Sequence, residues 1–414
     1  MATFSERSVE IGVVGLGECG CNLAVEFDRL GYAAVALNTS YTDLRGLPLT
    51  EKLYVGTNGR DGAGQDVLLG GQYLDANAEE ILDRVQSIAD GCDHILLTAG
   101  LGGGTGSNVI TLANLISKLG RPISVFATLP KNQEGSIAKV NAVQAVSQFN
   151  DTDVTSVVLV DNEKILLQFG SNSLTTFYHN ANSSVVNTLH EMNSLAHDTG
   201  LTPVRGFDGE DFRRVFTARG TLIYGQADLK REDLTVEDQL ANGLQTIWDN
   251  AGLLAAGFDY QDATMAGIVL VAPESLLAQA PTDIFENVIK QVRSLTSTVG
   301  IYTGLFATSD ETATPRLYTM LSGLPYPNRL KNVVSQAKEE GPALGTKVAR
   351  PMENLDLGDL SDLSLFNSSV MPAAPVSPRP RQEAPPQSPA ATPSPVSNSD
   401  NVEPESGPAN NPAS

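Results

Sequence analysis

The stretch "AGLGGGTGSN", residues 99–108, decides the fold. It follows an apolar run, "HILLTAG", which predicts a buried strand, and it precedes "NVITLANLISKL", which predicts a helix. Glycine fills five of the seven positions from 100 to 106, so consecutive backbone amides can form a concave anion site at the start of the helix. The hydroxyls of Thr105 and Ser107 would add donors to this site. No lysine follows the glycines, so the loop is not a lysine-containing P-loop.

The sequence on both sides of this loop predicts a parallel sheet. Within residues 1–170, short apolar runs alternate with helical patterns. The further runs predicted to be buried strands are "EIGVVGLG" (10–17), "YAAVALNTS" (32–40), "PISVFATLP" (122–130) and "VTSVVLVDN" (154–162). Such alternation is typical of an α/β fold with helices on both faces of the sheet and a ligand beyond the carboxyl ends of the strands. The glycine-rich loops follow strands, so we expect them to meet at that edge.

A second glycine-rich turn, "VVGLGECGCN" (13–22), contains Gly15, Gly17 and Gly20 at the spacing of a dinucleotide-binding loop. A fold that binds NAD also needs a carboxylate at the end of the second strand, where it holds the ribose hydroxyls. In this sequence that strand ends in Asn-Thr-Ser, residues 38–40. The missing carboxylate disfavours a nicotinamide-dependent oxidoreductase.

The composition is that of an acidic globular protein. The 414 residues leave room for two or three domains, and the formal net charge of −21 disfavours a nucleic-acid-binding protein, which would normally present a basic face. Three cysteines are too few for a disulfide framework, and the pair Cys19 and Cys21 lacks the second pair of ligands that a zinc site would need. No stretch resembles a signal peptide or a membrane-spanning run, so we expect a cytoplasmic protein that does not insert into membranes.

The chain beyond residue 170 predicts four further segments. Residues 171–200 predict one long helix that links two domains, because no Pro occurs in them and an apolar stripe recurs at helical spacing. Residues 201–325 predict a second, smaller α/β domain with strands in "GTLIYGQA", "TMAGIVLVA", "GIYTGLFATS" and "PRLYTMLSGL". Residues 326–371 begin with a predicted helix, "RLKNVVSQAKEE", and continue as an acidic, leucine-containing segment. Residues 372–414 hold 12 of the 23 prolines and no aromatic residue, which predicts a disordered Pro/Ser-rich tail.

The loop motifs, taken in order, resemble those of the tubulin/FtsZ superfamily of polymerising GTPases. "GGGTGS" resembles the glycine-rich signature loop of that family, and the second loop resembles that of FtsZ and, more closely, that of the archaeal CetZ group. The other matching motifs are "GECGCN" (17–22) for the first nucleotide loop, "NTSYTDLRGL" (38–47) for the second, "GRDGAGQD" (59–66) for the third and "LPKNQEG" (129–135) for the fifth. The resemblance covers residues 10 to 325 and implies a domain at 1–170 that binds GTP with Mg²⁺.

The resemblance also assigns nucleotide-binding residues. Asn22 and Asn182 would meet the guanine, Phe177 would stack on the base, and Glu134 would lie at the ribose. For Phe177, plain core packing remains the alternative. The other residues that the resemblance places at the nucleotide are Gly17, Glu18, Cys19, Gly20, Asn38, Gly62, Ala63, Gly64, Gly102, Gly103, Gly104, Thr105, Gly106 and Ser107, of which residues 62–64 would sense the γ-phosphate.

The family's catalytic loop has a counterpart in "VRGFDGEDFRRVF" (204–216), with Asp208 and Asp211 at its two acidic positions. In the family this loop enters the nucleotide site of the next subunit and positions the attacking water. Gly206 stands where the family has Asn, Glu210 competes for the same role, and a surface charge cluster is the alternative. The arginine that FtsZ carries after the fifth loop is replaced by Ala138, with Lys139 beside it, which would weaken or rearrange the phosphate clamp.

The sequence therefore predicts a GTPase that assembles head-to-tail with itself into filaments serving cell division or cell shape. The alternative within the same fold is a filament-forming scaffold that hydrolyses GTP slowly, suggested by Gly206 and Ala138. The segment "ENLDLGDLSDLSLF", Glu353 to Phe366, would dock an adaptor or membrane-anchor protein as a short helix, with an unstructured spacer as the alternative.

Overall fold

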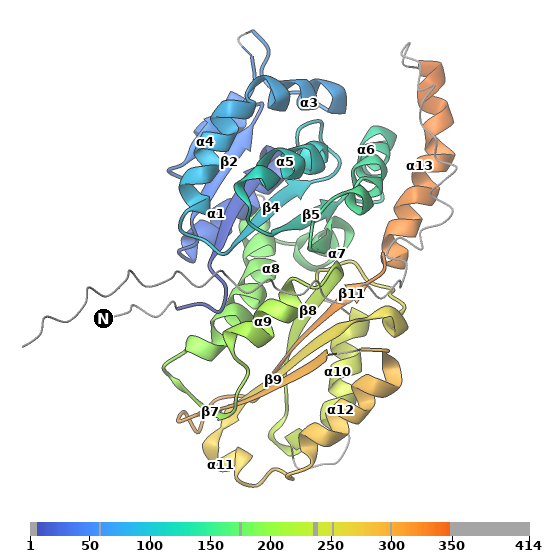
Figure 1. Cartoon of the computed structure of the whole chain (residues 1–414). Coiled ribbons are helices and arrows are strands. Elements are labelled where there is room, and N and C mark those ends of the chain that lie inside the picture. Colours follow the sequence, from blue (N-terminus) through green and yellow to red (C-terminus); the bar gives the residue numbers. More distant parts are fainter. Residues whose placement is uncertain are drawn as a thin grey trace, which may run out of the picture. The chain divides into compact units, whose positions relative to one another are not determined.

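The computed structural model describes residues 6–57, 59–173, 176–234, 239–250, 252–298 and 300–347. The acidic, leucine-containing segment and the Pro/Ser-rich tail lie outside these residues. Within them, eleven strands form one sheet in the order β3-β2-β1-β4-β5-β6-β8-β11-β9-β10-β7 (Figure 1). The strands are β1 (Ile11–Leu16), β2 (Ala34–Asn38), β3 (Lys52–Tyr54), β4 (His94–Gly100), β5 (Ile123–Leu129), β6 (Ser156–Asp161), β7 (Leu201–Arg205), β8 (Gly220–Asp228), β9 (Met265–Pro273), β10 (Gly300–Thr308) and β11 (Arg316–Leu324).

The α-helices connect these strands. They are α1 (Gly17–Arg29), α2 (Tyr41–Arg45), α3 (Val67–Ala76), α4 (Ala78–Ala89), α5 (Val109–Ile116), α6 (Ser136–Ser147), α7 (Asn162–Phe169), α8 (Phe177–Ser194), α9 (Gly209–Phe216), α10 (Gln239–Asn250), α11 (Glu274–Leu277), α12 (Ile284–Leu295) and α13 (Asn328–Lys347). No helix in the described part of the chain is both long and apolar enough to cross a membrane.

The first part of the sheet is parallel, as the sequence predicts. Strands β1 to β6 pair in parallel, and β8 continues this part through a parallel pairing with β6. Alternate residues of each strand face opposite sides, so Val13 joins the core beneath α1 and α8 while Val14 joins the core beneath α4 and α5. The α/β fold class is therefore confirmed, with helices on both faces of a buried sheet.

The strand order reverses at β1, which lies between β2 and β4. In open α/β sheets a ligand binds beyond the carboxyl ends of the strands at such a switch point. The two glycine-rich loops follow β1 and β4, so the fold brings them together at this point.

The second part of the sheet is mixed. Strand β11 pairs antiparallel with β8 and β9, whereas β9 and β10 pair in parallel. Strand β7 forms the edge and pairs antiparallel with β10. The four strands predicted in this region are confirmed as β8 to β11, but β7 and the short β3 were not predicted.

The long helix predicted over residues 171–200 is shorter in the structure. Helix α8 begins only at Phe177, because residues 170–172 form turns after α7, in which the Asn172 amide donates to the Phe169 carbonyl at 2.8 Å. Ser and Asn favour such local turns over a helix start. Helix α8 contacts α1 on the first part of the sheet and α9, which packs on β9 and β11 of the second part, so it lies between the two parts (Figure 1).

Candidate functional site

A cavity of about 490 Å³ opens at the carboxyl ends of β1, β2, β4 and β5. All the predicted phosphate-binding loops contribute to it. The predicted residues that line it are Gly17, Glu18, Cys19, Asn38, Gly62, Ala63, Gly64, Gly102, Gly103, Gly104, Thr105, Gly106 and Glu134. The structure thus brings together residues that are more than 100 positions apart in the chain.

The first loop passes directly into α1, whose amino terminus lies at the cavity. Gly17 has a φ of +72°, a conformation that suits glycine, and a Cβ there would lie 3.2 Å from the Gly106 amide nitrogen. Gly20 does not line the cavity: a Cβ there would lie 2.0 Å from the Thr98 carbonyl oxygen. Its small size therefore allows α1 to pack closely on β4, and the first loop supplies a helix terminus suited to an anion.

The loop after β4 is held in shape by its own hydrogen bonds. The Ser107 hydroxyl donates to the carbonyl oxygens of Leu101 and Gly103, at 2.7 and 2.6 Å, and Ser107 does not line the cavity. The Gly104 amide donates to the Gly64 carbonyl at 2.8 Å, and a Cβ at Gly104 would lie 2.8 Å from that oxygen. Ser107 and Gly104 thus shape the loop and its contact with residues 62–66, which is a different role from the direct donation expected of the Ser107 hydroxyl.

Thr39, which the sequence analysis did not assign, joins three of the loops. It is fully buried, and its hydroxyl lies 2.7 Å from that of Thr105 and accepts a hydrogen bond from the Ala63 amide at 3.0 Å. The Thr39 carbonyl accepts from the Gly62 amide at 2.9 Å. A threonine in the last three residues of the predicted second strand was the one signal in the sequence for this role.

A second cavity of about 150 Å³ adjoins the first, with Glu18, Cys19, Glu134 and Asn162 shared between them. The predicted base-binding residues Asn22, Phe177 and Asn182 all line this second cavity. The remaining residues that line either cavity and were not predicted include Ser40, Asp43, Asp61, Gln65, Thr128, Pro130, Lys131, Asn162 and Tyr178. Together the cavities form one elongated site, with glycine-rich loops at one end and amide and aromatic side chains at the other.

The larger cavity is acidic. Its ionisable carboxyl groups are Glu18, Asp43, Asp61 and Glu134, and none of the described residues that line it is Lys or Arg. Hydrogen bonds, of which that from the Thr42 side chain is the strongest cause, hold the pKa of Asp61 below its ordinary value. Burial raises the pKa of the Cys19 thiol to about 11, so this thiol is uncharged at neutral pH and is not a nucleophile.

A polyphosphate in such a cavity needs a cation. No cluster of three or more His, Cys, Asp or Glu side chains suited to a metal occurs among the described residues. Mg²⁺ does not require one, since it commonly binds through one or two carboxylates together with phosphate oxygens and water. The acidic wall of the cavity therefore fits Mg²⁺ that arrives with a nucleotide.

The residues at the position of the FtsZ arginine do not reach the cavity. Ala138 packs against the glycine-rich loop, since a Cβ on Gly102 would lie 3.0 Å from the Ala138 Cβ. Lys139 is buried and pairs with Glu340 of α13 at 2.7 Å. The positive charge next to Ala138 therefore forms an ion pair between α6 and α13 and does not face the cavity.

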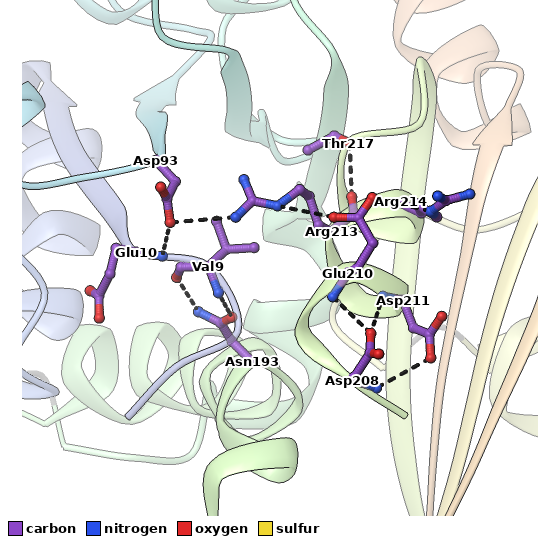
Figure 2. A network of polar contacts seen from close by, with 10 residues as sticks. All are labelled: Val9, Glu10, Asp93, Asn193, Asp208, Glu210, Asp211, Arg213, Arg214 and Thr217. Atoms are coloured by element: carbon purple, nitrogen blue, oxygen red, sulfur yellow. Dashed lines mark hydrogen bonds and ion pairs between the residues drawn. The ribbon is translucent and has the colours of Figure 1, made fainter. Parts of the chain in front are cut away.

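Asp208 and Asp211 lie at the amino terminus of α9, where they form a capping box (Figure 2). The Asp208 carboxylate accepts from the amides of Glu210 and Asp211, at 2.9 and 3.0 Å, and the Asp211 carboxylate accepts from the Asp208 amide at 3.2 Å. Burial is the main cause that raises the pKa of Asp211 above its ordinary value. Each carboxylate accepts the capping hydrogen bonds with one oxygen, and its second oxygen takes no part in them.

Glu210, the predicted competitor, is engaged by arginines. Its carboxylate lies 3.2 Å from Arg214 and 3.7 Å from Arg213, and Arg213 also pairs with Asp93 at 3.4 Å (Figure 2). Asp208 and Asp211 form no ion pair with these arginines in the described structure. The two aspartates are therefore the less neutralised carboxylates of the loop.

Asp208 and Asp211, the acidic pair, lie near the amino ends of the strands, whereas the cavities lie at their carboxyl ends. A Cβ on Gly209 would meet the Ser8 backbone, and Asp93 directly precedes β4, so α9 begins near the amino ends of β1 and β4. The glycine-rich loops follow the carboxyl ends of the same strands. The six residues of β1 span about 20 Å at about 3.3 Å per residue, so the acidic pair does not reach the cavity of its own chain.

Comparisons with known proteins agree over most of the chain. A model of the Tubulin/FtsZ family GTPase domain matches residues 10–169, and a model of the C-terminal domain of TubZ-like Tubulin/FtsZ-like proteins matches residues 181–334. The tubulin-like protein CetZ of Pyrococcus horikoshii is 24% identical over 339 residues, which cover 79% of this chain and 88% of that protein. The tubulin-like protein TubZ of Bacillus cereus is 24% identical over 410 residues, which cover 89% of this chain and 90% of that protein.

Solved structures show the same fold. The GTPγS-bound protofilament of CetZ2 from Haloferax volcanii has a TM-score of 0.67 at 22% identity and covers 81% of this chain and 99% of that chain. The GTPγS-form protofilament of TubZ from Bacillus thuringiensis serovar israelensis has a TM-score of 0.66 at 20% identity and covers 82% and 94%.

Proposed function

The chain belongs to the tubulin/FtsZ family, and from this premise we propose that it is a GTPase whose catalytic site is completed by a second copy of the chain. It binds GTP with Mg²⁺ in the paired cavities and stacks head-to-tail into filaments. The observation that carries this proposal is the separation of the acidic pair from the cavities by the length of β1.

The paired cavities suit a guanine nucleotide. The triphosphate lies against the loops of residues 17–20, 62–64 and 102–106, where backbone amides and the start of α1 favour an anion. Glu134 holds the ribose, Phe177 stacks on the base, and Asn22 and Asn182 pair with its polar edge, because an amide offers both a donor and an acceptor. Mg²⁺ neutralises the phosphate charge that the acidic wall would otherwise repel.

Hydrolysis needs a water held in line with the γ-phosphate and a group that orients it. Within one chain the cavity has the backbone amides that favour phosphate, but Asp208 and Asp211 of the same chain lie at the opposite ends of the strands. When a second copy stacks on the cavity by translation along the strands, its Asp208 and Asp211 reach the γ-phosphate with one oxygen each free of the capping bonds. The relatives solved as protofilaments support this arrangement.

The direct test is phosphate release per molecule as a function of protein concentration. We expect the rate to rise above an assembly threshold, because only junctions between copies are catalytic. Asp211→Asn should bind GTP normally and lower the rate by about 100-fold or more, the scale of a positioned acid–base group. The matched control is Glu210→Gln, one residue away in the same turn, which should change the rate by less than threefold. A rate per molecule that is independent of concentration would contradict the proposal.

The second candidate, a scaffold with slow turnover, is favoured by two observations. Ala138 places no charge at the phosphates, and Lys139 is committed to Glu340. Gly206 has open space around the position of a Cβ, so Gly206→Asn would introduce the family's side chain without a clash. A large gain of phosphate release in Gly206→Asn, with assembly unchanged, would favour the scaffold.

We further propose the domain division at residues 1–170, 171–200 and 201–325, a cytoplasmic location, and a role in cell division or cell shape. The segment from Glu353 to Phe366 docks an adaptor or anchor protein. Imaging of the tagged protein tests the cytoplasmic location and the role in cell division or cell shape. Imaging of a variant that lacks Glu353 to Phe366 tests the docking role, and an unchanged localisation of this variant would contradict it.

A further inference from the structure

Helix α13 lies along α6 and is attached to it by both apolar and polar contacts (Figure 1). Its residues Val333, Val334 and Ala337 form a buried cluster with Val140 and Val143. At the next turns, the Glu340 carboxylate accepts hydrogen bonds from Ser136 and Lys139 of α6, at 2.8 and 2.7 Å. Helix α6 follows the loop of residues 130–135, so α13 rests on the element that carries this side of the nucleotide site.

The first turn of α13 is attached more directly, through Arg329. Its Nε donates to both carboxylate oxygens of Asp161, at 3.0 and 2.9 Å, and its Nη2 donates to the Pro130 carbonyl at 2.8 Å. The Arg329 side chain is 10% exposed and that of Asp161 is 5% exposed. Because the pair is buried, removal of one partner leaves the other charge without compensation.

One partner of Arg329 lines the paired cavities, and the other directly precedes a residue that does. Pro130 lines the larger cavity, and Asn162, which follows Asp161, lines both. Asp161 also caps α7 by accepting from the Glu163 amide at 3.0 Å. Arg329 of α13 is therefore bonded to the end of β6 and to the residue that follows β5, and it holds the two relative to each other.

The two wall segments are also bonded to each other. The Asn132 amide donates to the Glu163 carboxylate at 2.9 Å, and the Gln336 side chain of α13 lies 3.4 Å from the Asn132 side-chain oxygen. Glu134, the proposed ribose ligand, is in the same loop, where its carboxylate accepts from the Lys131 amide at 3.0 Å. Movement of α13 would thus displace a loop that touches the nucleotide.

We propose that Arg329 is a positioning residue for the nucleotide site, which couples the docking of α13 on α6 to occupancy of the paired cavities. The inference rests on the proposed function, since it takes GTP or GDP as the occupant. Coupling is reciprocal: the nucleotide stabilises the docked helix, and the docked helix raises the affinity for the nucleotide.

The first measurement is the affinity of the full chain for GTP and GDP with Mg²⁺, by titration below the assembly threshold. Arg329→Met should weaken binding by at least tenfold. Arg329→Lys keeps a charge opposite Asp161 but cannot also reach Pro130, so its affinity should lie between those of the wild type and of Arg329→Met. The matched control is Arg7→Met. Arg7 is similarly buried, at 12% exposed, and also bridges a carbonyl and a carboxylate, but it is bonded to Leu30 and Glu10, away from the paired cavities.

The second measurement separates positioning from general stability. Amide hydrogen exchange of residues 333–337 should slow at least fivefold when GDP and Mg²⁺ are added to the wild-type protein, and this slowing should be smaller in Arg329→Lys and lost in Arg329→Met. Arg7→Met should retain it even if its melting temperature falls. Affinities of the Arg329 variants equal to that of Arg7→Met, or exchange in α13 that does not respond to GDP in the wild type, would overturn the inference alone. A wild-type protein that binds neither nucleotide would overturn the proposed function as well.

Discussion

At the level of single residues, Thr39 shows how much of the site depends on one hydroxyl. This group is buried between the Thr105 hydroxyl and the Ala63 amide. Thr39→Val has nearly the same shape but leaves both partners unpaired, which costs about 1–3 kcal/mol for a buried group. We expect GTP affinity to fall by about tenfold or more in a titration.

The matched control for this change is Thr39→Ser, which keeps the hydroxyl and removes only a methyl group. It should bind GTP within threefold of the wild type. If Thr39→Val and Thr39→Ser bind equally well, the hydroxyl does not organise the loops.

His94 is a buried residue outside the site that makes stability depend on pH. Its pKa is lowered from 6.5 to about 3, chiefly by burial and then by Arg213. Between these values the unfolded chain binds a proton that the folded chain excludes, so stability falls as pH drops below 6.5. From pH 7.5 to 5.0 this residue should cost about 2 kcal/mol.

Urea unfolding of the wild type and of His94→Gln at the two pH values measures this cost. Other carboxyl and histidine groups titrate in both proteins, so the difference between the proteins isolates His94. The variant should lose less stability than the wild type over this range. Equal losses would show that His94 is protonated in the folded state.

At the level of elements, α9 combines a structural and a proposed catalytic role in the same side chains. Asp208→Ala removes the helix cap, which should cost about 0.5–2 kcal/mol of unfolding free energy, whereas Asp208→Asn keeps a capping oxygen. Both variants should lower GTP hydrolysis, but only Asp208→Ala should lower the melting temperature. Wild-type hydrolysis by a stable Asp208→Asn protein would limit Asp208 to capping.

The elements that the sequence predicts well are those with buried, regular patterns. Strands β1, β4 and β5 are buried, largely apolar runs, and β1 and β4 are followed by loops whose glycines indicate a close approach. Strand β7 was missed because it is a short edge strand that contains Pro203 and is largely exposed, so it lacks the apolar alternation that marks a strand.

The side-chain roles that could not be predicted depend on partners far away in the chain. Lys139 meets Glu340 and Arg329 meets Asp161, in each case across more than 160 positions. No local spacing encodes such a pair, because it arises only when α13 returns to pack on α6. By contrast, Asn22, Phe177 and Asn182 were found from the motifs as residues of one site, and the structure places them around one cavity.

At the level of the whole molecule, the net charge of −21 bears on self-association. Copies of a strongly acidic chain repel one another, and added salt screens this repulsion because the Debye length falls from about 30 Å at 0.01 M to about 3 Å at 1 M. The protein concentration needed for assembly with GTP and Mg²⁺ should therefore fall as KCl rises from about 0.05 to 0.5 M. Sedimentation at several salt concentrations measures it, and a threshold that rises with salt would mean that attractive ion pairs dominate the junction.

The location of the cavities and the acidic pair at opposite edges of one sheet gives each molecule a direction. In a stack built as proposed, every copy between the two ends gives its aspartates to one neighbour and receives those of the other, so the two ends of the stack are chemically different. One end has an open pocket, where GDP can be replaced by GTP but not formed, and the other end has unused aspartates. A stack of n copies holds n − 1 catalytic junctions, so the share of molecules carrying GDP increases with length. The nucleotide content of a filament would then record how long it has grown.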